Sequence, residues 1–256
     1  MKSKRIEFKG AKDVALVGQL DLPDDGSSKG IILFAHCFTC SRNLKSIHAI
    51  AKSLTENGWG VFRFDFTGIG DSSGDFSETT LRTNVDDLRA AADWLEQNHE
   101  SPTVLMGHSM GGSAVLLAAP DMQSCKAVIT LATPASPKFL LEAYANQMDE
   151  LEKTGFIETT IAGRTFKLNR DFFDELENQA RQQDVKNLQR PLLIIHSEKD
   201  RLVPIQHAEQ LLHLADYPKS LLTFKNQDHL FSDMDLAAQL GHILADWVEL
   251  FVERTR

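Results

Sequence analysis

Short apolar runs alternate with longer amphipathic stretches along almost the whole chain, and this alternation restricts the possible folds more than any other feature. Ile31–Ala35 is a continuous apolar run, which is typical of a parallel strand buried on both faces. Asn43–Glu56 carries apolar residues at helical spacing and ends before Gly58, a residue that favours helix termination. Repeated over 256 residues, this order predicts a mainly parallel central sheet with helices on both faces, the α/β class.

The rest of the chain continues the same order of strands and helices. Further strands are expected at Val14–Leu22, Gly60–Phe64, Thr103–Met106, Lys126–Ala132, Leu192–His196 and Ser220–Phe224. The first of these alternates apolar and polar residues imperfectly and is expected to be an edge hairpin strand. Further helices are expected at Leu81–Asn98, Met110–Ala119, Pro204–Leu214 and Ser232–Val252. For the last helix we expect Ser232 and Asp235 to form a capping box, and a buried stripe of Leu236, Leu240, Ile243, Trp247 and Phe251.

One segment, from about residue 134 to 184, breaks this order because it lacks a buried parallel strand. It is expected to contain a polar helix at Phe139–Lys153, a hairpin of Ile157–Ile161 and Arg164–Leu168 about Ala162-Gly163, and a polar helix at Phe172–Gln183. We expect this segment to be a small cap inserted into a single domain that spans residues 1–256. Its aromatic residues are more numerous than a polar surface requires, so some are expected to bind substrate: Phe139, Tyr144, Phe156, Phe166 and Phe172.

The sequence Gly107-His108-Ser109-Met110-Gly111 matches the pattern G-x-S-x-G of a nucleophile elbow. In such a turn a strand runs directly into a helix, and the serine between them adopts a strained backbone conformation. Only small residues two positions to either side let the strand and helix approach each other. A pattern of this length also arises by chance. Here, however, a strand is expected directly before it and a helix directly after it, which indicates that Ser109 is a nucleophile at a helix N-terminus.

A serine hydroxyl is a weak nucleophile and needs a base within hydrogen-bond reach. With this elbow the expected chain order is Ser, then Asp or Glu, then His. His229 follows the last expected strand and is the candidate general base. Asp200 lies in the loop after the strand at Leu192–His196, where a carboxylate can hold the imidazole in its productive tautomer. Glu198 is the rival carboxylate, and Asp200 could instead be a helix cap or a surface residue.

The loop after the first buried strand, residues 36–41, is the candidate oxyanion loop. An oxyanion hole needs two backbone N–H groups aimed at one point. The Met110 amide, directly after the nucleophile, is expected to be the first donor, and the Phe38 amide is expected to be the second. In this arrangement the backbone amides matter more than the Met110 and Phe38 side chains.

The same loop contains Cys37 and Cys40 at the C-x-x-C spacing of a thiol-redox motif. Half of a zinc site is another interpretation, but the second cysteine pair is missing because Cys125 stands alone. We therefore expect no metal site, and the simplest expectation is two buried, reduced and inert thiols. A disulfide would constrain the backbone that holds the Phe38 amide, so we also hypothesise that oxidation lowers the activity reversibly. Such a bond requires Cα atoms within about 7 Å of each other.

The net charge of −9 repels phosphate backbones, so we expect no nucleic-acid partner. No apolar run approaches the length needed to cross a bilayer, and charged residues interrupt the N-terminal segment where a secretory signal would lie. We therefore expect no membrane partner and a cytoplasmic location. Three cysteines do not suggest a disulfide framework. The sequence leaves the oligomeric state open.

With these residues in place, the chain resembles the α/β-hydrolase superfamily over essentially its whole length. It looks most like the hydrolase half of bacterial proteins that carry an OsmC-like peroxide-reducing domain, and it is also similar to small feruloyl-type carboxylesterases. The matching segments are residues 35–41, residues 64–76, Ile161-Ala162-Gly163-Arg164 and Asp228-His229-Leu230. The resemblance implies a triad of Ser109, Asp200 and His229. The chain departs from the superfamily pattern at Cys37, where many members have glycine. Cysteine adopts a positive φ less readily than glycine does.

The expected function is cleavage of an acyl bond, above all a carboxylic ester of a small-molecule substrate, through an acyl-enzyme on Ser109. No cofactor is expected. Thioesters, amides and lactones require the same machinery, and analogy of fold does not choose among them. Two other classes stay open: a thiol-redox protein that uses Cys37 and Cys40, and a catalytically silent interaction protein on a hydrolase scaffold.

Overall fold

The computed structural model describes residues 1–161, 163–178 and 185–252. Eight strands form one sheet in the order β1-β2-β4-β3-β5-β6-β9-β10. The pairs β1/β2 and β2/β4 are antiparallel, and the strands from β4 to β10 run parallel. The strands are β1 (Lys2–Lys9), β2 (Ala15–Leu22), β3 (Ile31–Ala35), β4 (Gly60–Phe64), β5 (Pro102–His108), β6 (Ala127–Leu131), β9 (Leu192–Ser197) and β10 (Lys219–Phe224). The predicted mainly parallel sheet is confirmed.

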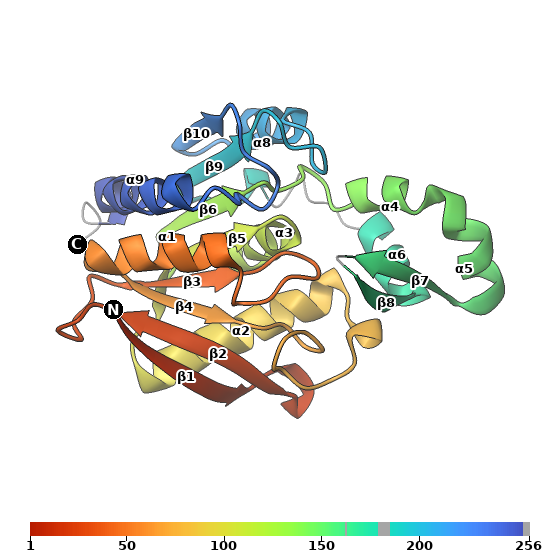
Figure 1. Ribbon diagram of the computed structural model, residues 1–256, viewed down its shortest axis with the longest axis horizontal. Helices are drawn as coiled ribbons and strands as arrows, with labels where there is room; N and C mark the ends of the chain where they lie inside the picture. The colour runs from red at the N-terminus through yellow and green to blue at the C-terminus, as the bar shows by residue number, and fades with distance from the viewer. Residues whose placement is uncertain (162, 179–184, 253–256) are drawn as a thin grey trace.

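Helices cover both faces of the sheet, as Figure 1 shows. On one face α1 (Lys45–Glu56) and α9 (Met234–Val252) pack side by side, and their buried side chains share one apolar core. On the other face α2 (Leu81–Asn98), α3 (Met110–Ala118) and α8 (Gln206–Leu214) contribute to a second core. The central strands β3, β4 and β6 are mostly apolar because both of their faces are buried, and the buried Arg63 of β4 is paired with Asp21.

Three details of the body differ from the sequence-based expectations. The strand β1 was not expected, and its pairing with β2 moves β2 away from the sheet edge. The side chain that caps α9 is Asp233, whose Oδ1 accepts from the amides of Asp235 and Leu236, so the predicted box with Ser232 is wrong. Ile243, which was expected in the buried stripe of α9, is 42% exposed. The buried face of this helix instead includes the small residues Gly241 and Ala245.

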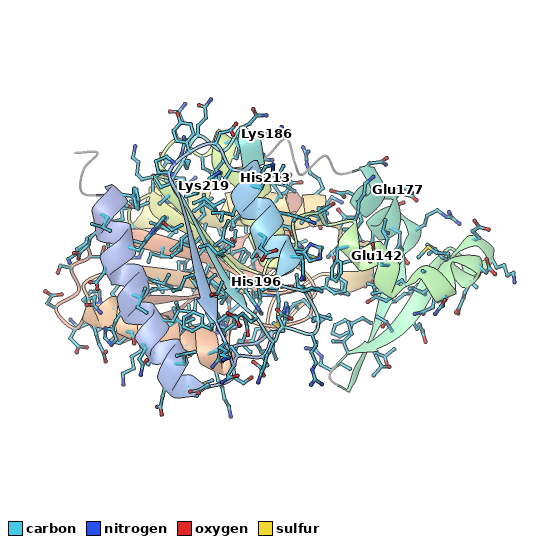
Figure 2. All side chains as sticks on the ribbon, turned by 90° about the horizontal axis from the view of Figure 1, so that it is seen from above. Glu142, Glu177, Lys186, His196, His213 and Lys219 are labelled. Atoms are coloured by element: carbon cyan, nitrogen blue, oxygen red, sulfur yellow. A yellow bond between two sulfur atoms is a disulfide. The ribbon has the colours of Figure 1, made fainter. Side chains whose placement is uncertain are left out.

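The chain between β6 and β9 forms a lobe beside the body (Figures 1 and 2). It contains α4 (Phe139–Ala143), α5 (Met148–Thr154), the antiparallel hairpin β7 (Phe156–Ile161) and β8 (Arg164–Asn169), and α6 (Arg170–Asn178). The cap expected at about 134–184 falls in this lobe, but its first predicted helix is divided into α4 and α5 by a 3₁₀ turn at Ala145–Gln147. The predicted turn residue Ala162 and the predicted end of the second helix, residues 179–183, lie outside the described residues.

The parallel strands bring the candidate site together at one edge of the sheet. β3 pairs with β5, and β9 pairs with both β6 and β10. Loops that leave the carboxyl ends of these strands therefore meet at the same edge. Buried residues of the cap, among them Phe172, Phe173 and Leu176, belong to the same apolar cluster as residues of α2 and α3, so the cap is packed on the body.

Candidate active site

Ser109 lies in the turn between β5 and α3 with φ 53° and ψ −118°, a conformation that residues other than glycine rarely adopt. The flanking glycines make this turn possible. A side chain on Gly107 would collide with the backbone of Gly111, and a side chain on Gly111 would collide with the carbonyls of Ala35 and His36. The sequence pattern therefore encodes a close crossing of β5, α3 and the loop after β3. Ser109 is half-buried at this crossing.

His229 and Asp200 form a hydrogen-bonded pair, with Nδ1 of His229 2.7 Å from Oδ2 of Asp200. The Asp200 side chain is fully buried, and its Oδ1 accepts from the amides of Leu202 and Val203, both at 2.9 Å. Burial alone raises the pKa of Asp200. The hydrogen bond and charge of His229 and the two amides outweigh burial, so this pKa lies below its ordinary value. The carboxylate is thus held ionised, and it directs the Nδ1–H tautomer of His229.

A second pair of contacts joins the loops that carry these two residues. The Ser197 hydroxyl donates to the carbonyl of Gln227 at 2.6 Å and accepts from the amide of Gln227 at 3.1 Å. Ser197 ends β9, and Gln227 lies two residues before His229. The rival carboxylate, Glu198, is exposed, and its backbone amide pairs with the carbonyl of Phe224. The structure therefore joins Asp200, and not Glu198, to His229.

His229 lies beside the elbow. The Nε2 atom of His108, the neighbour of Ser109, is 2.8 Å from the backbone carbonyl of His229, and the two rings lie 5.0 Å apart between centroids. Burial lowers the pKa of His108 to about 3, so its imidazole stays neutral. Within the described part of the chain, the Ser109 hydroxyl makes no hydrogen bond to His229. Such contacts are frequently long before substrate binds.

Two backbone amides near Ser109 lack an acceptor among the residues that the structure describes: those of Phe38 and Met110. Met110 begins α3, and the first amides of a helix have no intrahelical partner. Phe38 lies in the loop after β3, and β3 is the strand next to β5. Cys37 is not among the described residues with positive φ, so its place in the loop does not require glycine.

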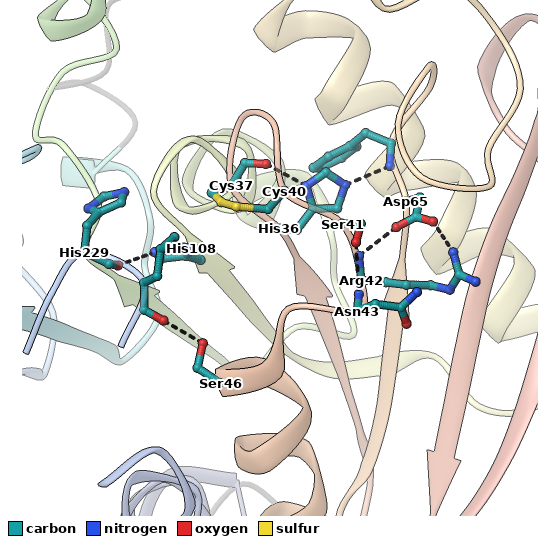
Figure 3. The surroundings of a disulfide bond; sticks show 12 residues. His36, Cys37, Cys40, Ser41, Arg42, Asn43, Ser46, Asp65, His108 and His229 are labelled. Atoms are coloured by element: carbon teal, nitrogen blue, oxygen red, sulfur yellow. Dashed lines mark hydrogen bonds and ion pairs between the residues drawn. A yellow bond between two sulfur atoms is a disulfide. The ribbon is translucent and has the colours of Figure 1, made fainter. Parts of the chain in front are cut away.

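Long-range contacts hold this loop in place, as Figure 3 shows. The buried ring of His36 bonds the carbonyl of Cys37 through Nδ1 at 2.6 Å and accepts from the amide of Phe66 through Nε2 at 3.0 Å. The buried Asp65 carboxylate accepts from the backbone amide of Arg42 at 2.7 Å and pairs with the Arg42 guanidinium. Burial lowers the pKa of His36, which keeps its ring neutral.

Cys37 and Cys40 are joined by a disulfide, with Cα atoms 5.2 Å apart (Figure 3). The expectation of two reduced thiols is therefore wrong for this structure, and so is full burial, because Cys40 is half-buried. Two cysteines at C-x-x-C spacing can be bonded when one turn brings their side chains together. Here the amide of Cys40 donates to the carbonyl of Cys37 at 3.2 Å, which closes that turn.

The aromatic residues expected to bind substrate occupy different places. Phe172 stacks on Phe38 of the loop after β3 at 5.1 Å between centroids, and Phe166 packs on Phe76 at 4.9 Å. The other three lie in contact with cap or α8 residues: Phe139 with His207, Tyr144 with Phe173, and Phe156 with Lys167. The structure thus brings Phe172 to the candidate site and gives Phe139, Tyr144 and Phe156 packing contacts.

Several supporting residues were not singled out from the sequence. The buried Asp65–Arg42 pair and the His36 contacts depend on residues about 20 to 30 positions apart, which no local pattern reveals. His196 is another such residue. Its buried Nε2 lies 2.8 Å from the carbonyl of Val203 and 3.6 Å from Asp200, and burial lowers its pKa. Phe173 could have been proposed because it follows Phe172. Phe76 could have been proposed because it ends the segment of residues 64–76 that carries the resemblance.

Comparisons with known proteins agree with this fold. Residues 26–168 match the model of a hydrolase family described as serine aminopeptidase, S33. The solved esterase domain of a Rhodothermus marinus protein is 37% identical, covers 98% of this chain and 100% of its own, and superposes with a TM-score of 0.81. Est1E from Butyrivibrio proteoclasticus, solved with ferulic acid bound, is 23% identical over 93% of this chain and 96% of its own, with a TM-score of 0.76, and indicates the fold alone.

Two curated proteins are also similar in sequence. The uncharacterized protein YfhR of Escherichia coli K12 is 28% identical over 239 residues, which are 90% of this chain and 75% of that protein. The lysophosphatidylserine lipase ABHD12 of Macaca fascicularis is 29% identical over 78% of this chain, and the match spans about half of that protein, 49%. None of the helices in the described ranges is both long and apolar enough to span a membrane.

Proposed function

This chain belongs to the α/β-hydrolase family described as serine aminopeptidase, S33, and we propose that within this family it acts as a serine esterase. The observation that carries the proposal is the buried Asp200–His229 pair beside a strained elbow serine. Ser109 attacks the carbonyl carbon of the substrate. His229, whose Nδ1–H is directed to Asp200, takes the serine proton on Nε2 and returns it to the leaving alcohol. Water then attacks the acyl-enzyme. His229 takes a proton from this water and returns it to Ser109 as the acid product leaves.

The negative oxygen of the tetrahedral intermediate is bound by the amides of Phe38 and Met110. Their freedom from other acceptors in the described part of the chain supports this role, and the N-terminus of α3 adds a favourable dipole. A donor of this kind contributes about 10²- to 10³-fold to turnover in related mechanisms. The contacts of His36 and Arg42 hold the backbone on both sides of Phe38.

A carboxylic ester of a small molecule is the proposed substrate class. Similarity to an esterase domain and to a lysophosphatidylserine lipase supports ester over amide cleavage. The stacked pair Phe38 and Phe172 offers an apolar and aromatic surface at the oxyanion loop. We propose that this surface receives an apolar or aromatic acyl group.

The cytoplasm remains the proposed location.

The test is a panel of p-nitrophenyl and hydroxycinnamate esters, with matched amides and thioesters, on the wild type and on Ser109→Ala. Esters should be cleaved fastest, and the variant should lose this activity while it keeps its far-UV circular dichroism spectrum. Faster cleavage of the amides would replace the ester assignment. Wild-type protein without activity toward any acyl substrate would favour a catalytically silent scaffold.

A thiol-redox role is a second candidate, because Cys37 and Cys40 are bonded in the structure. The bond lies in the loop that carries the Phe38 amide, so a change of redox state would act first on the hydrolase. Fluorophosphonate labelling combined with thiol titration distinguishes the two. A redox protein would turn over a dithiol substrate in the absence of Ser109, and an esterase would not.

A further inference from the structure

Three side chains able to bind a metal ion meet next to the candidate active site. Cys37 and Cys40 come from the loop after β3, and His108 comes from the end of β5. Their ligand atoms, the two sulfurs and a ring nitrogen, all lie within 4.8 Å of one another. The parallel pairing of β3 with β5, in which Ala35 faces Gly107, brings the loop to His108 (Figure 3). No local pattern reveals this cluster, because Cys40 and His108 are 68 positions apart in the sequence.

His108 has the hydrogen bonding of a metal ligand. Its Nε2 faces the backbone carbonyl of His229 at 2.8 Å, and a carbonyl can only accept, so Nε2 carries the proton. Nδ1 then has a lone pair. This atom is buried in a side chain that is 1% exposed, and it finds no hydrogen-bond partner among the described residues. Metal-binding histidines commonly donate their other N–H to a carbonyl in this way.

The buried Nδ1 has no hydrogen-bond partner among the described residues although its ring lies beside two sulfurs, and this needs an explanation, because buried polar atoms are nearly always paired. In the disulfide form the sulfurs offer it no good donor. We propose that the reduced protein binds one Zn²⁺ ion through the Cys37 and Cys40 thiolates and Nδ1 of His108, and that this site and the disulfide exclude each other. Two thiolates and one imidazole form a soft ligand set suited to Zn²⁺.

The chemistry is balanced as follows. A phosphine or dithiol reductant supplies two electrons to the Cys37–Cys40 bond, two protons are taken up to give two thiols, and the reductant is oxidised. Zn²⁺ then displaces the two thiol protons and binds the thiolates, while the neutral His108 ring binds without losing a proton. The ion keeps its fourth position for water, as zinc with three protein ligands usually does.

The required geometry is close to the observed one. With Zn–S of about 2.3 Å and Zn–N of about 2.0 Å, a tetrahedral site places its ligand atoms about 3.6 to 3.8 Å apart. The sulfurs must separate after reduction, and the nitrogen-to-sulfur distances, within 4.8 Å now, must shorten by about 1.2 Å or less. The Cα separation of 5.2 Å is that of two cysteines on one turn, so rotation of the side chains supplies these movements.

The test uses Co²⁺ as a coloured stand-in for Zn²⁺ and does not depend on hydrolysis. Purified protein is reduced with a phosphine, freed of reductant under argon and titrated with Co²⁺. The reduced wild type should give a thiolate-to-cobalt charge-transfer band that saturates at one ion per chain, and one equivalent of Zn²⁺ should abolish it. Oxidised wild type should give no such band. A band of equal strength in both redox states, or none in either, would overturn the proposal.

Variants then assign the ligands. Cys37→Ser and Cys40→Ser should each reduce the charge-transfer intensity and weaken binding by more than the roughly 10- to 100-fold typical of an outer contact. His108→Gln keeps an amide donor for the His229 carbonyl and should weaken binding similarly. Cys125→Ser is the matched control, because this buried thiol is unbonded to the other two cysteines and should leave the titration unchanged. Wild-type affinity in His108→Gln, in protein with a native melting curve, would contradict the assignment of His108.

Discussion

The proposed nucleophile elbow and the proposed oxyanion loop lie next to each other at the ends of β5 and β3, but they are held in different ways. The elbow is fixed locally: Gly107 and Gly111 let the chain turn within five residues, and Ser109 carries the strain. The loop is held by contacts with residues distant in sequence, of His36 with Phe66 and of Arg42 with Asp65, and by its own Cys37–Cys40 bond. The elbow should therefore tolerate few substitutions. The backbone of the loop, in contrast, can change when one of these contacts or its disulfide changes.

The largest effect is expected at the elbow. Ser109→Ala removes the nucleophile and should lower kcat for esters by about 10⁶-fold, since the members of a triad act as one unit. One hydroxyl at a half-buried turn adds little to stability, so the melting temperature should change little. Steady-state kinetics and a thermal melt check both points. Residual kcat within tenfold of wild type would move the nucleophile elsewhere.

The next largest effect is expected at the pair that activates the elbow. Asp200→Asn should lower kcat by about 10⁴-fold, because the amide no longer favours the productive tautomer of His229. Glu198→Gln is the matched control, since Glu198 is exposed two residues away and should change kcat less than about twofold. Parallel pH–rate profiles of the two variants provide the measurement. A larger loss in Glu198→Gln would show that the wrong carboxylate had been assigned.

A smaller effect is expected at the oxyanion loop. A displacement of the Phe38 amide by about 1 Å could cost about 100-fold in rate, so the oxidised and reduced proteins should differ in kcat by up to that factor, with the oxidised form slower. Ester turnover after diamide and then after a phosphine, with a chelator present throughout, measures this difference. Cys37→Ser should not respond. Equal turnover in the two forms of the wild type, with the bond verified by mass, would remove the switch.

The smallest effect is expected where the cap contacts this loop. Phe172→Leu removes the ring that stacks on Phe38. It should change the ratio of kcat/KM between bulky and short esters by about tenfold. Phe156→Leu is the control, because its ring contacts Lys167 of the hairpin. Ratios measured on one protein preparation are independent of the folded fraction. If both variants scale all esters equally, the cap is a structural cover.

The contrast between elbow and loop also explains what could be predicted from the sequence. The strands and helices of the body have strong periodicity, and the expected helix Leu81–Asn98 coincides with α2 at both ends. The elbow is a five-residue pattern, so Ser109 could be located by local reasoning alone. The carboxyl ends of parallel strands meet at one edge, so Asp200 and His229 could be proposed as partners without knowledge of their distance.

Long-range contacts account for what the sequence did not reveal. Strand β1 has only two buried apolar residues, Ile6 and Phe8, so its apolar–polar alternation is weak in the sequence. It is stabilised by its pairing with β2. The C-x-x-C spacing allowed several states, and only the fold places His108 beside the two sulfurs. The cap aromatic residues looked alike in sequence, and only their neighbours separate Phe172 from the residues that pack elsewhere.

The central claim is that Ser109 is the nucleophile activated by the His229–Asp200 pair, and covalent trapping tests it most directly. The wild-type protein, reduced and oxidised, is treated with a fluorophosphonate, and the adduct is located by peptide mass spectrometry. The account predicts one adduct per chain, on Ser109, absent in Ser109→Ala and formed far more slowly in Asp200→Asn. An adduct on another residue, or undiminished labelling of Ser109→Ala, would contradict it.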